Sequence, residues 1–232
     1  MISGLLLSIA RSGPRGSRGE REDALGSEAV SSNRLTQADR SALSERRTLE
    51  AAVALMGERG YEKTTLAAIG EAAGYSRGLA THLFGSKADL FARVIRWISD
   101  RVRRQVEPEL RKRDGLDALF AFVDAHSKFA DQNPVMTRAL YVLWFQSLIA
   151  DSPMRDAAIE DLLGHRDRIR RIIEQGITAG TVRGDADANA EAIQFCGALF
   201  GLGLQWLIDP DGFQTEDMHR RFKERLGATL RP

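Results

Sequence analysis

From about Ser41 to its end, the chain repeats the 3.6-residue spacing of apolar side chains that is typical of amphipathic helices. No segment shows the two-residue alternation of a half-buried strand, and glycine, proline or aspartate separates the helical stretches. The pattern therefore predicts an all-α fold. Beyond Pro108 the expected helices cover residues 115–131, 134–150, 154–180, 187–208 and 215–229.

Three shorter helical stretches come before residue 86. The first ends at Gly60, where glycine can take the left-handed conformation that stops a helix. Thr65 can cap the second helix, which must end at Gly74, and Ser76 is expected to cap the third. A capping box at residues 86–89 (SKAD) then opens a long helix that runs through Val106.

Residues 65–84 have the pattern of a helix-turn-helix, in which a first helix braces a second. In such a motif the N-terminal side chains of the second helix can enter the major groove of DNA. Gly70 is small where the two helices approach each other, and Gly74 can make the turn between them. Residues 65–84 are therefore a candidate DNA-binding motif.

The helix expected after Ser76 presents a set of polar and small residues. Arg77 can bind guanine through two hydrogen bonds or clamp a phosphate, and His82 and Lys87 can reach phosphates or base edges. Solvated side chains are the competing interpretation for all three. The candidate DNA-binding residues are Thr65, Ser76, Arg77, Gly78, Leu79, Thr81, His82 and Lys87.

Residues 42–102 resemble the DNA-binding domain of the tetracycline-repressor (TetR) family. The resemblance rests on ERGYEKTT at the end of the first helix, then LAAIGEAAGYSRG, then a phenylalanine followed by SKADLF. This chain departs from the family at three positions. Thr81 stands where a tyrosine commonly packs on the DNA backbone, Gly70 where alanine is usual, and Tyr75 where valine is usual. Thr81 leaves a smaller contact with DNA.

The resemblance implies a homodimeric transcription regulator, usually a repressor, that binds a palindromic double-stranded DNA operator. A small molecule that enters the C-terminal helical domain would release the operator. We accordingly expect a disordered tail at residues 1–41, which are rich in Ser, Gly and Arg, then a DNA-binding domain at 42–102. Residues 103–232 would form the helical effector-binding and dimerisation domain.

Aromatic and polar residues in the expected helices at 115–131 and 134–150 could line a cavity for a hydrophobic effector, although aromatic residues at this spacing also fit a plain core. The candidate effector-binding residues are Phe122, His126, Tyr141, Trp144, Phe145 and Gln146. The stretch at 192–208 is apolar on nearly all sides, so it could pack against a second copy of the chain. The candidate interface residues are Gly197, Phe200, Gly201, Leu204 and Phe222.

Composition and motifs narrow the classes of protein to which this chain could belong. The net charge of +1 excludes a histone-like polycation, and the single cysteine, Cys196, fits a reducing cytoplasm. The apolar run at 195–204 is far shorter than a bilayer requires. No HExxH, Walker or GxSxG motif occurs, and the four histidines are scattered, so we expect no enzyme, metal or cofactor. A helix-turn-helix protein without a small-molecule trigger and an all-helical enzyme or carrier remain as alternatives.

Overall fold

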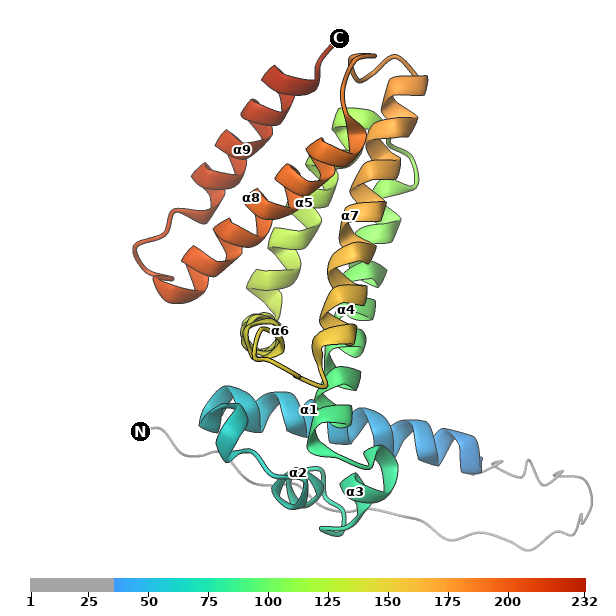
Figure 1. The fold of residues 1–232 in the computed structure, drawn as a ribbon, viewed down its shortest axis with the longest axis vertical. Coiled ribbons are helices and arrows are strands. Elements are labelled where there is room, and N and C mark those ends of the chain that lie inside the picture. Colours follow the sequence, from blue (N-terminus) through green and yellow to red (C-terminus); the bar gives the residue numbers. More distant parts are fainter. Residues whose placement is uncertain (1–35) are drawn as a thin grey trace, which may run out of the picture. The chain divides into compact units, whose positions relative to one another are not determined.

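The computed structural model describes residues 36–232, and this part of the chain contains helices and no strands (Figure 1). The predicted all-α fold is confirmed. The helices are α1 (Gln37–Lys63), α2 (Leu66–Ala72), α3 (Leu79–Phe84), α4 (Lys87–Leu110), α5 (Gly115–Gln132), α6 (Pro134–Ser147), α7 (Arg155–Thr178), α8 (Ala188–Ile208) and α9 (Thr215–Leu230).

Helix α1 begins earlier than the apolar spacing predicts. Residues 1–35 of the expected tail lie outside the described residues, and the helix starts at Gln37 rather than near residue 42. Thr36 caps it: its hydroxyl accepts a hydrogen bond from the backbone N–H of Asp39, whose carboxylate accepts one from the backbone of Thr36. Near the other end, Gly60 leaves the helical conformation with φ +76°, as its sequence position predicts.

The start of α3 differs from the prediction that Ser76 caps it. Helix α3 begins at Leu79, and Gly78 is the capping residue, without a side-chain hydrogen bond. The backbone N–H of Leu79 donates to the carbonyl of Ser76, so residues 76–79 form one more turn before the helix. The serine thus holds this turn through its backbone rather than its side chain.

Helix α4 joins the two halves of the described chain, which are helices α1–α3 before it and helices α5–α9 after it. Ser86 caps it as predicted, because its hydroxyl accepts a hydrogen bond from the N–H of Asp89. The helix packs against α1 and α3 near its start and against α5, α6 and α7 farther along. Its buried residues, among them Phe91, Ile95 and Ile98, belong to a core that includes residues of both halves. Any displacement of α4 therefore reaches both halves.

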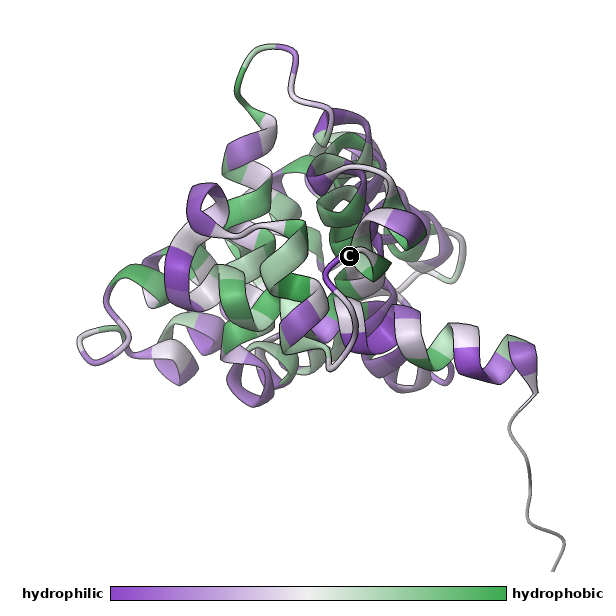
Figure 2. Cartoon of the chain, turned by 90° about the horizontal axis from the view of Figure 1, so that it is seen from below, coloured by the Kyte–Doolittle hydropathy of each residue, from purple (hydrophilic) through white to green (hydrophobic). Residues whose placement is uncertain are grey.

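The later helices match the predicted segments closely, except that α6 ends at Ser147 rather than at residue 150. Hydrophobic residues gather on the helix faces that turn toward one another (Figure 2). Within residues 36–232, α8 is the helix that is long and apolar enough, by length and composition, to cross a membrane. In this structure it packs against α7 and α9 and buries Phe195 and Leu199 among them.

Candidate DNA-binding surface and ligand cavities

The predicted helix-turn-helix is present, and we call residues 65–87 the reading head. Ile69 of α2 and Ala80 of α3 are fully buried between the short helices. A Cβ on Gly70 would lie 2.7 Å from the carbonyl oxygen of Ser76, so this glycine lets α2 approach the turn before α3. Gly74 makes the turn with φ +80°. Both glycines are where the sequence predicts a close approach and a turn.

Most of the predicted DNA-binding residues lie at the surface of the reading head. Leu79 and Lys87 are half-buried, and the others are exposed: Thr65, Ser76, Arg77, Gly78, Thr81 and His82. Thr65 also caps α2, because its hydroxyl accepts a hydrogen bond from the N–H of Ala68 at 3.2 Å. The polar groups that could contact DNA are therefore available at one end of the structure without rearrangement of the backbone.

Arg77 has a neighbour that the sequence analysis missed. Its Nε donates to Oε1 of Glu71 on α2 at 2.5 Å, while 77% of the Arg77 side chain stays exposed. Such an exposed ion pair is weak, so a phosphate or a guanine can compete for the guanidinium. Glu71 lies six residues before Arg77, beyond the three- and four-residue spacings at which helical side chains meet.

Lys87 connects the reading head to α1. Its Nζ donates to the carbonyl oxygen of Glu62 at 3.3 Å and lies 4.1 Å from the centre of the Tyr61 ring. Burial raises the pKa of Tyr61, whose ring also packs on Phe91 of α4. Lys87 thus has a positioning role inside the protein in addition to its predicted role toward phosphate.

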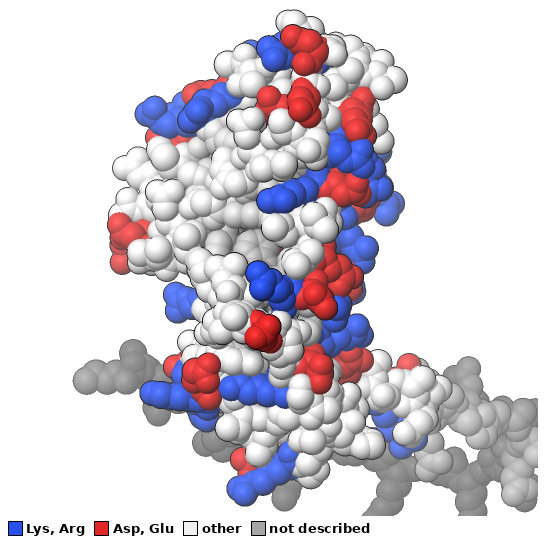
Figure 3. All heavy atoms as spheres, in the orientation of Figure 1, with Lys and Arg blue, Asp and Glu red and all other residues white. Residues whose placement is uncertain are grey.

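Three of the predicted effector-binding residues come together. Tyr141, Trp144 and Phe145 of α6 line a groove of about 450 Å³, which we call the effector groove. Its other walls are mostly apolar residues of α7 and α8, among them Leu162 and Leu204, together with Arg155 at the start of α7. Figure 3 shows a largely uncharged face over α8, hollowed where α6, α7 and α8 meet. The volume and lining are typical of a site for a small apolar ligand.

The structure places the other three effector candidates elsewhere. Phe122 is buried and lines a separate cleft between α4 and α7. His126 lines two narrow interior cavities of about 20 Å³ each, which are large enough for about one water molecule. Gln146 lines none of these spaces. The six candidates therefore do not form one site.

A polar network lies between these spaces. Trp144 Nε1 donates to Asp161 Oδ2 at 3.0 Å, and Nε2 of His165 lies 3.5 Å from the other oxygen of that carboxylate. Tyr141 donates to the carbonyl of Phe200 at 2.8 Å, and burial raises the Tyr141 pKa. Burial lowers the pKa of His126 to about 3, with smaller effects from His165 and His219. His126 is therefore neutral at physiological pH.

The predicted interface residues differ in their surroundings. A Cβ on Gly197 or Gly201 of α8 would meet no atom within 4 Å, so both glycines face open space in the single chain. Phe200 and Phe222, by contrast, pack inside the chain, Phe200 on Trp144 at 4.8 Å and Phe222 on Phe195 at 5.3 Å between ring centres. Leu204 lines the effector groove. The glycine face is the open part of α8.

Comparison with known protein families identifies both halves. Residues 49–94 match the family described as bacterial regulatory proteins, tetR family, and residues 115–231 match the C-terminal part of BetI-type transcriptional repressors. The chain belongs to the TetR family. The resemblance to the TetR family is thus confirmed, with a match over residues 49–94, and the family extends through the C-terminal helices.

Three relatives show how far the likeness extends. The TetR-family chain is 30% identical over 83 residues to the HTH-type transcriptional regulator CymR of Pseudomonas putida, an alignment that covers 36% of this chain but only 41% of CymR. A probable acrEF/envCD operon repressor of Escherichia coli K12 is 24% identical over 79% of this chain and 83% of the repressor. A complex of SmeT from Stenotrophomonas maltophilia with triclosan has a TM-score of 0.70, 18% identity, and coverage of 82% and 92%.

These findings make the protein a DNA-binding transcriptional regulator with the TetR fold. The family and the matched relatives are regulators rather than enzymes. The helix-turn-helix thus belongs to a family of DNA-binding regulators, and the C-terminal helices belong to a repressor-type domain.

Proposed function

We propose that the protein is a homodimeric repressor that binds a palindromic operator on cytoplasmic DNA and leaves it when a small hydrophobic effector occupies the effector groove. The observation that carries the proposal is the exposure of Ser76 and Arg77, in the turn before α3, and of Thr81 on α3, all three on a braced helix-turn-helix. One such unit reads one half-site, so two copies are needed for a palindrome. The other proposed DNA contacts are Thr65, Gly78, Leu79, His82 and Lys87.

Apolar exposure on α7 and α8 supports the dimer. Ile159, Leu163 and Ile193 are 46%, 53% and 42% exposed, and Gly197 and Gly201 lie on a face with open space above their Cα atoms. Exposed apolar side chains, together with glycines that leave room for another backbone, favour a two-fold contact between identical helices. Gly197, Gly201 and Leu204 are the proposed interface residues that can reach a second copy directly.

Two contacts connect the effector groove with the reading head. Helix α6, which supplies Tyr141, Trp144 and Phe145, packs on α1, where Val135 would lie 3.3 Å from a Cβ on Gly57. Helix α7, on the opposite wall of the groove, packs on α4, whose first residue, Lys87, is the last residue of the reading head. An effector that binds one arrangement of α6 and α7 better than the other would change the spacing of two reading heads.

A DNA-binding titration tests the proposal. The full chain is titrated, at fixed salt concentration, onto DNA that flanks its own gene and onto scrambled DNA of equal length. We expect a dimer to bind the flanking DNA specifically, and we expect triclosan, used as an apolar probe, to weaken this binding. Triclosan should release the Trp144→Ala variant from DNA less effectively than the wild type. Specific binding that a panel of apolar compounds leaves unchanged would instead favour a helix-turn-helix protein without a small-molecule trigger.

A further inference from the structure

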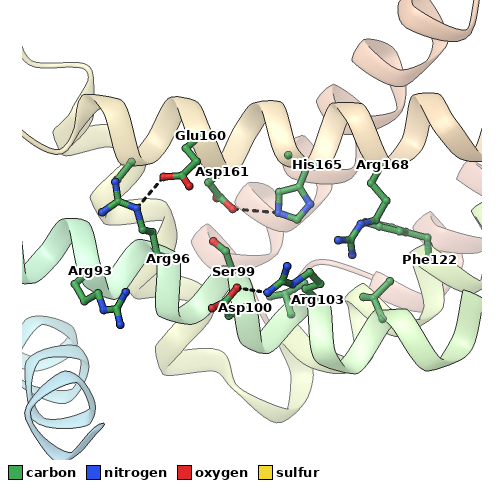
Figure 4. A pocket seen from close by; sticks show the side chains of 14 residues that line it. Arg93, Arg96, Ser99, Asp100, Arg103, Phe122, Glu160, Asp161, His165 and Arg168 are labelled. Atoms are coloured by element: carbon green, nitrogen blue, oxygen red, sulfur yellow. Dashed lines mark hydrogen bonds and ion pairs between the residues drawn. The ribbon is translucent and has the colours of Figure 1, made fainter. Parts of the chain in front are cut away.

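A second cavity, the α4–α7 cleft, is shown in Figure 4. The α7 residues that line it differ from those that line the effector groove. Helices α4 and α7 line its two walls, and its volume is about 350 Å³. Gly164 stands in the middle of the α7 wall, and a Cβ there would meet no atom within 4 Å. The cleft is therefore open at its centre, and it is large enough for a small organic molecule.

Ion pairs between the two helices bracket the cleft. At one end Arg96 Nε of α4 lies 2.7 Å from Glu160 Oε2 of α7, and at the other Arg168 of α7 lies 3.5 Å from Glu107 of α4. Arg103 pairs with Asp100 on its own helix at 2.7 Å. A guanidinium group carries five N–H donors, so each of these arginines keeps donors for a further acceptor.

Two of the arginines face each other across the cleft. The guanidinium groups of Arg103 and Arg168 turn into the same part of the cleft from opposite walls (Figure 4). Only 24% of the Arg168 side chain is exposed; burial lowers its pKa, the charge of Glu107 raises it, and the charge of Arg103 lowers it by a smaller amount. An anion between the two groups would offset their repulsion and accept charge-assisted hydrogen bonds from both.

Apart from Asp161, whose carboxylate already has partners, the side chains at the floor of the cleft are apolar. Phe122, Val102 and Val106 are buried there. The carboxylate of Asp161 also lies in the floor, but Trp144 and His165 already occupy its oxygens and its side chain is 4% exposed. A cation would therefore have no free buried carboxylate, whereas an anion with an apolar body would meet both free donors and an apolar surface.

We propose that the α4–α7 cleft is a second ligand site, which binds a small organic anion with its carboxylate or phosphate between Arg103 and Arg168 and its apolar body against Phe122. The site is distinct from the effector groove, and the hydrogen bond from Trp144 to Asp161 joins the two. Because the bound anion competes with Glu107 of α4 for Arg168 of α7, it weakens one of the ion pairs that fix α4 against α7.

Isothermal titration calorimetry on the full chain, without DNA, tests the site. The probes are naphthalene-2-carboxylate, phenyl phosphate and, as a neutral match for the first, naphthalene-2-carboxamide. We expect the anions to bind and the amide to bind at least about tenfold more weakly. Arg168→Gln should weaken anion binding about tenfold or more, and Gly164→Phe should abolish it by filling the cleft.

Arg170→Gln is the matched control, because Arg170 sits on the same helix but pairs with Asp167 and Glu174 of α7 itself. It should bind the anions as the wild type does, and thermal unfolding confirms that each variant folds. Equal binding of carboxylate and amide would overturn the site. So would anion binding that survives in both Arg168→Gln and Gly164→Phe, or no anion binding below about 10 mM. Since DNA is absent, these outcomes are independent of operator binding and release.

Discussion

The reading head and the effector groove are built by contacts of different range. In the reading head most polar side chains bond to residues three to six positions away, as Thr65 does to Ala68 and Arg77 to Glu71, and Lys87 is the exception because it bonds to Glu62, 25 positions away. In the groove region Trp144 bonds to Asp161 and Tyr141 to Phe200, 17 and 59 positions away. The reading head is thus held mainly by contacts between residues that are close in sequence, whereas the groove forms only when helices distant in sequence pack together.

This difference separates two kinds of mutational effect. An exposed side chain of the reading head can be removed with little loss of stability, because its contacts in the free protein are weak and solvated. A side chain of the groove region is tied to the core, so its removal changes stability and ligand binding together. The four predictions below test this separation, from the largest expected effect to the smallest.

Gly70→Val is expected to reduce DNA binding and stability together, although the residue belongs to the reading head. A Cβ at Gly70 would lie 2.7 Å from the carbonyl of Ser76, and a backbone group cannot move aside cheaply. We expect loss of specific DNA binding and a decrease of about 1–3 kcal/mol in the free energy of unfolding, measured by urea denaturation. Gly78→Ala is the control for the stability measurement alone, because a Cβ at that position meets no atom within 4 Å. Wild-type stability in Gly70→Val would contradict the close approach.

Arg77→Ala should affect DNA alone. With 77% of its side chain exposed, Arg77 contributes little to folding, so the free energy of unfolding should change by less than about 0.5 kcal/mol. Loss of a guanine or phosphate contact should weaken specific binding about tenfold to a hundredfold in a fluorescence anisotropy titration. Glu71→Gln, which releases Arg77 from its ion pair, should bind at least as tightly as the wild type. Unchanged affinity of a folded Arg77→Ala protein would remove Arg77 from the DNA-binding surface.

Gly197→Leu tests the open face of α8. A leucine fits the single chain there, because a Cβ meets no atom within 4 Å, and Gly197 does not line the effector groove. Crowding between two copies should raise the dissociation constant of the dimer about tenfold or more, as measured by analytical ultracentrifugation. Gly201→Leu should have the same effect while also narrowing the groove. Gly164→Leu, on α7, is the control that should leave association unchanged, and an equal change in all three would argue against an interface on α8.

The sequence predicted the local parts of this molecule well. Thr65 and Ser86 are helix caps, and Gly74 is a turn, because each of these roles depends only on a few neighbouring residues. Ser76 shows the limit of such rules, since a backbone hydrogen bond to Leu79 replaced the side-chain cap. The ion pair of Arg77 with Glu71 escaped prediction because it depends on the angle between α2 and α3.

The candidate effector site was predictable only in part. Tyr141, Trp144 and Phe145 share one helix, so their common position in the groove follows from their spacing. Phe122 and His126 lie near them in the packed domain but face other cavities, and no periodicity tells which side of α5 meets which helix. The residues of α7 and α8 that complete the groove could not be identified without the fold, because packing alone brings them to α6.

His126 provides the last test, a pH dependence that only the packed domain can produce. Burial lowers its folded-state pKa to about 3, whereas an exposed histidine in the unfolded chain titrates near 6.5. Between these values the unfolded chain binds a proton that the folded protein does not, so the contribution of His126 to stability is fully present well above pH 6.5 and falls as the pH decreases through this value. The limiting slope is about 1.4 kcal/mol per pH unit, and we expect a loss of about 1 kcal/mol between pH 6.5 and 5.5.

Urea denaturation at several pH values measures this slope. His126→Phe should flatten it, since the ring can take the place of the imidazole beside Phe122 and no longer titrates. Part of the slope should remain, because burial also lowers the pKa of His219. His82→Gln removes a histidine from the exposed surface of the reading head and serves as the control. A His126→Phe slope equal to that of the wild type would mean that the imidazole of His126 takes up a proton in the folded protein as it does in the unfolded chain.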